Sequence, residues 1–82
     1  MNPSAMAFQA LAWSLMDEAR AERLLSLTGL TPEGLRSTIH ERSTQAAILS
    51  FLEAHEPDLV ACAAVIGVSP AVLVQARQEL EA

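Results

Sequence analysis

A short pattern occurs twice in this chain and constrains its fold more than any other feature. The copies are Leu27–Leu35 and Val65–Leu73, and each reads as an apolar helix end, a glycine, an apolar residue, a Ser or Thr, and a proline. Glycine adopts the left-handed conformation that ends many helices. A hydroxyl side chain caps the following helix, and proline suits its first turn. The two copies therefore predict two tight helix-turn-helix corners.

Caps and hydrophobic periodicity predict about six short helices along the chain. No segment alternates between polar and apolar residues with the period of a strand, so we expect no sheet. The predicted fold is all-α, a compact bundle in one domain over residues 1–82. Asn2, Pro3 and Ser4 introduce the first predicted helix, and the other predicted helix starts are Asp17, Thr31, Ser43, Pro57 and Ser69.

The repeated pattern has two interpretations. Leu11 and Trp13 also match Leu49 and Phe51 at the same separation, which extends the repeat upstream. Under one interpretation the chain is a duplication, with two three-helix halves in pseudo-symmetric contact. Under the other, the pattern is a general sequence for a tight corner, and the two sites converged on it.

Composition and charge indicate a soluble cytoplasmic protein. The chain has 51% hydrophobic residues, which is enough to fill a core, and its ten acidic residues outnumber its five arginines. The net charge of −5 disfavours binding to nucleic acid and to anionic membranes. Cys62 is the single cysteine, so no internal disulfide forms and nothing indicates secretion. The apolar stretch from Ala5 to Met16 lacks a preceding positive charge and is too short to span a bilayer.

The fifth predicted helix is apolar on every side. From Leu59 to Ile66 it carries no polar side chain apart from the weakly polar thiol of Cys62. A helix that is hydrophobic all round is typically buried all round. We therefore expect this helix at the centre of the bundle.

The first predicted helix carries two apolar stripes on opposite sides. One stripe contains Phe8, Leu11, Ala12 and Leu15, and the other contains Met6, Trp13 and Met16. Tryptophan and methionine are enriched at the centres of protein interfaces. Met6, Trp13 and Met16 are therefore the predicted partner-binding residues of a non-catalytic interaction module or homodimer. In the alternative interpretation, Trp13 closes the core of its own domain.

A second functional hypothesis is DNA binding through the corners. The segment around Gly67 follows the spacing of a bacterial helix-turn-helix motif, and Arg36, Arg42 and Arg77 are the candidate contacts. That spacing encodes helix packing, whereas DNA affinity depends largely on neutralising phosphates with basic residues. Five scattered arginines against ten carboxylates make direct DNA binding the less favoured function.

The sequence predicts no catalytic, cofactor-binding or metal-binding residue, and the chain is not expected to be an enzyme. The cluster His55–Asp58 has one histidine and two carboxylates but no HExxH or CxxC spacing. Cys62 lies in an apolar helix with no cation nearby in sequence to lower its pKa, so we expect an inert core residue.

Two segments carry a resemblance to a known family. RLLSLTGLTPEGLR, followed by AAILSFLEAHEPDLVACAAVIGVSPAVL, resembles a family of small all-helical bacterial proteins of unknown function, found mainly in alphaproteobacteria. The resemblance covers roughly Leu11 to Arg77. It implies an all-helical fold and a cytoplasmic location, and it brings no activity, cofactor or site residue with it.

Overall fold

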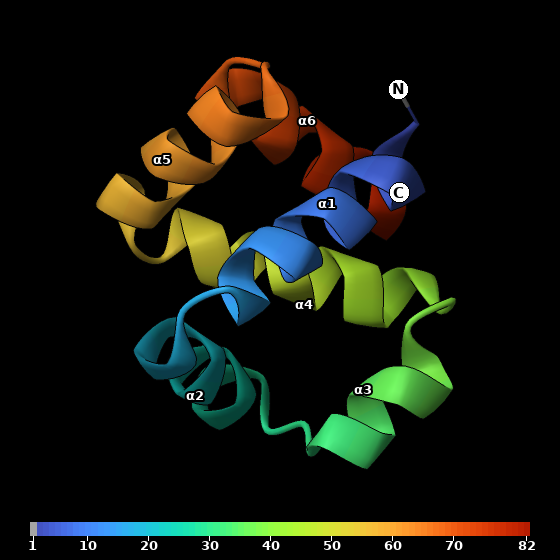
Figure 1. Ribbon diagram of the computed structural model, residues 1–82. Coiled ribbons are helices and arrows are strands. Elements are labelled where there is room, and N and C mark those ends of the chain that lie inside the picture. The colour runs from blue at the N-terminus through green and yellow to red at the C-terminus, as the bar shows by residue number, and fades with distance from the viewer. Residues whose placement is uncertain (1) are drawn as a thin grey trace.

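The computed structural model describes residues 2–82, which form six α-helices joined by short loops (Figure 1). The all-α prediction is confirmed. The helices are α1 (Pro3–Leu15), α2 (Glu18–Thr28), α3 (Pro32–Thr38), α4 (Arg42–Glu53), α5 (Glu56–Ile66) and α6 (Pro70–Glu81).

The central helix is α4, which packs most extensively against α6 and also contacts α1, α2 and α5. Figure 1 shows α4 crossing the molecule behind α1. α4 carries large buried side chains on several of its sides. Because α1 and α6 pack on these side chains, the three helices together form the core. The buried residues of α4 are Thr44, Gln45, Ala46, Ile48, Leu49, Phe51 and Leu52.

The prediction that the fifth helix occupies the centre is wrong. α5 buries Leu59, Cys62 and Ala63, whereas Val65 is 68% exposed and Val60 is 49% exposed. Five of the eight residues from Leu59 to Ile66 are alanine or valine, and these side chains fill less of a core than leucine or phenylalanine. An apolar helix made largely of small residues can therefore lie at the surface. α5 covers one side of α1, α4 and α6.

Both predicted corners are present. Gly29 ends α2 with φ of 73° and Gly67 ends α5 with φ of 89°, and both lie in the left-handed region. Thr31 caps α3, because its Oγ1 accepts a hydrogen bond from the Gly34 amide at 2.9 Å. Ser69 precedes α6 without a side-chain capping bond, so the second corner depends on Gly67 and Pro70.

The predicted start of the fourth helix is shifted. Ser43 was expected to cap it, but α4 begins at Arg42 and its N-cap is Glu41, which makes no side-chain capping bond. By contrast, Asn2 and Asp17 cap α1 and α2 through their side chains.

The third helices of the two proposed halves pack differently. α6 lies along α4, but its counterpart α3 projects away from the central helices (Figure 1). α3 has only 7 residues and places Leu35 in the core, whereas α6 buries Leu73, Ala76 and Leu80 along three turns. The repeated corner sequence is therefore not accompanied by equivalent packing of the two halves.

Within residues 2–82, no single helix combines the length and hydrophobicity needed to cross a bilayer. α5 and α6 together reach this length and hydrophobicity, but the chain bends by 98° between them.

Replacing Gly67 with alanine tests the corner between α5 and α6. Nothing lies within 4 Å of a Cβ built at Gly67, so the cost of the substitution is purely conformational. A left-handed residue other than glycine costs about 1–2 kcal/mol, and we expect Gly67→Ala to lower the free energy of unfolding by that amount. Urea denaturation measures the loss.

Gly67→Asn is the control and should cost less, because asparagine tolerates this conformation. Equal stability of Gly67→Ala and the wild type would contradict the assignment.

Candidate functional site

The predicted interaction stripe of α1 does not form one exposed surface. Met6 and Trp13 are 5% and 8% exposed and belong to the core, whereas Met16 follows the last helical turn and is 80% exposed. Ala7, Ala10 and Ser14 are buried beside the first two, and these small side chains let α1 approach α4 and α6 closely. The alternative interpretation, in which Trp13 closes the domain's own core, describes its position in the structure.

Arg20 holds Trp13 in place at the corner between α1 and α2. Its guanidinium carbon lies 3.6 Å from the centroid of the indole ring, and its Nη2 donates a hydrogen bond to the Trp13 carbonyl. Such a cation–π contact strengthens when the cation is removed from water. The Arg20 Nε is buried and has no acceptor among the described residues. Arg20 therefore has a structural role that the sequence did not reveal, because its partner is a ring face seven positions earlier.

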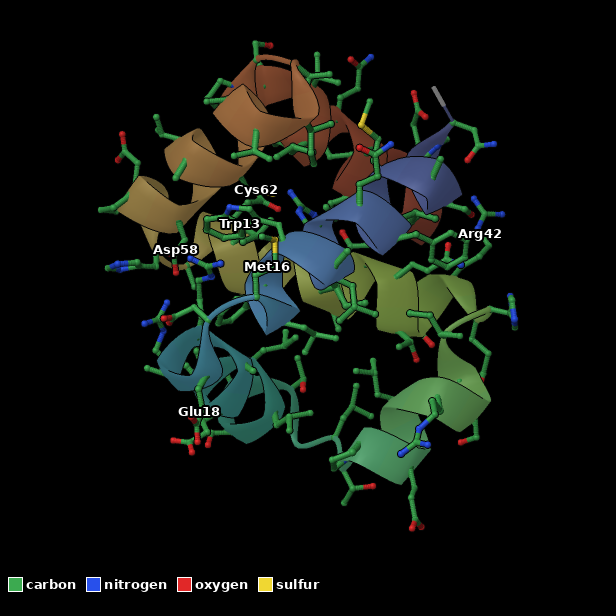
Figure 2. All side chains as sticks on the ribbon, viewed as in Figure 1. Trp13, Met16, Glu18, Arg42, Asp58 and Cys62 are labelled. Carbon is green, nitrogen blue, oxygen red and sulfur yellow. The ribbon has the colours of Figure 1, made fainter. Side chains whose placement is uncertain are left out.

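Cys62 lies on α5, which contacts α1, and its label falls close to that of Trp13 in the view of Figure 2. Burial raises the pKa of the Cys62 thiol from 9.0 to about 11, while Arg20 lowers it and Asp58 raises it. The thiol is fully buried and stays protonated at neutral pH. This environment is that of a core residue, as expected from the apolar sequence around it.

The three arginines proposed for DNA binding do not form one free basic surface. Arg77 forms ion pairs with Glu53 and Glu81. Its pKa is raised, and the largest cause is the hydrogen bond to Glu53. Arg42 donates a hydrogen bond to the Glu79 carbonyl at 2.7 Å and lies at the opposite end of α4 from Glu53 (Figure 2). The Arg42 guanidinium therefore lies beside Glu79 of α6, which is two residues from Arg77 in sequence, but each of these two arginine side chains is engaged within the domain. Arg36 lies on α3, so the three side chains do not build one basic surface.

Two residues of the polar cluster His55–Asp58 have structural roles. His55 is the N-cap residue of α5, and Asp58 forms an ion pair with Arg23 of α2. Among the described residues, no group of three or more His, Cys, Asp or Glu side chains is placed to hold a metal ion.

An apolar groove of about 350 Å³ lies between α1, α2 and α3. Its lining comes from all three helices and contains a single charged side chain. The lining residues are Leu11, Leu15, Leu25, Pro32, Leu35, Arg36 and Ile39. A larger depression of about 760 Å³ between α2, α4 and α6 has a mixed lining that includes Thr28, Ser43, Ser50 and Glu81.

The apolar stripe of α1 that lines the groove continues beyond it to Phe8. Leu15 is 49% exposed, and Phe8 on the same stripe is 39% exposed. The Phe8 ring meets the His40 ring edge to face, with centroids 6.1 Å apart. The sequence showed this stripe of α1 but assigned the interface to the opposite one. The contributions of Leu25, Pro32 and Ile39 were missed, because no local pattern shows that α2 and α3 leave a gap beside α1.

The family model described as "Protein of unknown function (DUF3572)" matches residues 1–82. The chain belongs to this family. The match confirms the resemblance to a family of unknown function and extends it beyond the two segments that carried it. The comparisons with curated proteins and with solved structures gave no significant match. Membership in DUF3572 therefore brings no assigned activity with it.

Replacing Arg20 tests its role at the corner between α1 and α2. Arg20→Ala removes the cation–π contact and the hydrogen bond to the Trp13 carbonyl, and we expect it to lower the free energy of unfolding by about 2 kcal/mol. The emission of Trp13, the single tryptophan, should also shift to longer wavelength as water reaches the ring. Arg23→Ala is the control: its guanidinium carbon lies 5.6 Å from the Phe51 ring centroid, and Trp13 emission should not change. An unshifted spectrum in Arg20→Ala would contradict the contact.

Cys62 should make stability depend on pH in the alkaline range. Between about 9 and about 11, the unfolded chain loses the thiol proton while the folded chain retains it, so the free energy of unfolding falls as pH rises. The chain has no lysine and no tyrosine, and an α-amino group titrates at about 8, so Cys62 dominates this window. Denaturant titrations at several pH values measure the slope. Cys62→Ala should remove it, and a slope that persists in this variant would assign the effect elsewhere.

Proposed function

We propose that this protein is a non-catalytic interaction module that binds a segment of another protein in the groove between α1, α2 and α3. The groove itself carries the proposal. It is lined by six apolar side chains, among them the exposed Leu15, and one arginine, and the exposed Phe8 continues the same stripe along α1. Exposed apolar surface of this kind, when contiguous, is typical of binding grooves.

The energetics of the groove support a docking role. Burying an aliphatic side chain that water otherwise contacts contributes about 1.5–3 kcal/mol. A segment that covered Leu15 and the partly exposed Leu11, Leu25 and Ile39 would gain a fraction of this from each side chain. The polar rest of the surface, with its net negative charge, keeps the free protein in solution despite this exposed region.

The wall formed by α3 supports the same function. This helix has only 7 residues and no extensive packing against another helix, and the Gln45 side chain holds its end by donating to the Ile39 carbonyl at 2.9 Å. A wall with so few tertiary contacts can shift to fit an incoming side chain at low cost. The rigid wall, α1, is fixed by its buried face.

A different protein fits this role better than a second copy of the chain. Each copy carries a net charge of −5, so two copies repel each other over distances comparable with the Debye length. The alternative function, DNA binding, gains no support from the arginines, because Arg42 and Arg77 are engaged within the domain.

Selection of peptides against the intact protein tests the proposal. A random display library of 16-residue peptides is selected on the wild type, and binding of the winners is measured by isothermal titration calorimetry. We expect Leu15→Asp to weaken binding more than tenfold, because it places a charge in the apolar lining. Val65→Asp is the matched control, since Val65 is more exposed than Leu15 and lies on α5, outside the groove.

Two outcomes would overturn the proposed site. One is that no peptide is selected in repeated rounds. The other is that Leu15→Asp and Val65→Asp bind the selected peptides equally well, which would place the binding surface elsewhere. Circular dichroism of both variants checks that the helices are retained.

A further inference from the structure

Four of the five arginines are occupied within the domain, and the fifth is at the groove. Arg20 stacks on Trp13, Arg23 pairs with Asp58, Arg42 bonds to the Glu79 carbonyl, and Arg77 pairs with Glu53 and Glu81. Arg36 makes no hydrogen bond or ion pair with any residue of 2–82. We infer that the groove selects an amphipathic helix carrying a carboxylate that pairs with Arg36. This inference rests on the proposed function.

The setting of Arg36 favours a carboxylate from outside the domain. Glu33 lies one turn earlier on α3, a spacing at which ion pairs form on helices, yet no Glu33–Arg36 pair is present. The guanidinium is instead exposed beside the apolar lining of Leu35 and Ile39. A cation next to a surface that excludes water on binding discriminates strongly for an anionic partner group.

The shape of the groove favours a helix over an extended segment. Leu11 and Leu15 are four residues apart on α1, and Leu35 of α3 is four residues before Ile39, the residue that follows the last residue of this helix. Pairs of apolar residues at this spacing form ridges of the kind between which the side chains of another helix pack. An extended peptide gains its affinity mainly by pairing with the edge of a sheet, and residues 2–82 contain no strand.

The occupant is therefore a helix with apolar residues at intervals of three and four and an acidic residue at the side that faces α3. The acidic residue gives the groove its specificity, and the apolar residues supply most of the affinity. A purely apolar helix should bind more weakly, and a helix with a basic residue at the same position should be rejected.

The experiment is a charge reversal on the peptides selected above. Against the wild type, the winners should share one acidic position; against Arg36→Glu as bait, the same position should become basic. We expect Arg36→Glu to weaken binding of the acidic peptide about tenfold. Changing the acidic peptide residue to lysine should restore binding to this variant. Arg42→Glu is the matched control. It changes the net charge by the same amount at an exposed arginine outside the groove and should leave affinity within about twofold.

The outcomes separate this inference from the proposed function. If peptides lose affinity in Leu15→Asp but bind wild type and Arg36→Glu equally, the inference is wrong and the proposed function stands. If no peptide depends on Leu15, the proposed function is wrong as well. Two further results would overturn the inferred occupant. Displacement of the peptide by micromolar dodecanoate would indicate a fatty acid, and a dimer in light scattering that Leu15→Asp dissociates would indicate a second copy.

Discussion

The burial of α4 between α1 and α6 is the constraint on which the rest of the structure depends. Ile48, Leu49 and Leu52 of this helix are fully enclosed. A buried polar residue on α4 also connects distant parts of the chain. The Gln45 side chain accepts a hydrogen bond from the Ser4 hydroxyl at 2.8 Å and donates one to the Ile39 carbonyl, which ties the start of α1 and the end of α3 to α4. Its amide is thereby satisfied on both sides, as a buried polar group must be.

The same constraint explains why the groove exists. α1 uses its Met6 and Trp13 side to pack on the central helices, and this commits its Phe8 and Leu15 side to solvent. α2 follows after a turn fixed by the Asp17 cap and the Arg20–Trp13 contact, and α3 is held mainly at its end. Three helices thus meet without enough side-chain volume to close the space between them. The opening is a consequence of how α1 is packed, and its apolar lining is what makes it a candidate for binding.

Much of the fold could be predicted because its signals are local. The left-handed glycines, the Asn2, Asp17 and Thr31 caps, and the order of six helices all follow from residues a few positions apart. The prediction for α5 failed because periodicity shows where apolar residues lie, whereas the centre of a bundle is decided by side-chain volume. The partner-binding stripe predicted on α1 is not the stripe that lines the proposed groove, and two of its three members, Met6 and Trp13, are buried. Two apolar stripes are equivalent in sequence, and only the neighbouring helices distinguish the packed one from the exposed one.

By itself, the sequence determined that this chain forms short helices with two sharp corners, because backbone conformation and capping depend on contacts between near neighbours. It also determined an acidic surface and an inert buried thiol. Only the tertiary structure decided which helix is central and which arginine remains unpaired, since both depend on contacts between residues far apart in the chain. The ion pairs of Arg23 with Asp58 and of Arg77 with Glu53 form only once helices distant in sequence are packed together. Within residues 2–82, Arg36 has no carboxylate partner from another helix, because α3 projects from the bundle, and its charge lies beside the groove.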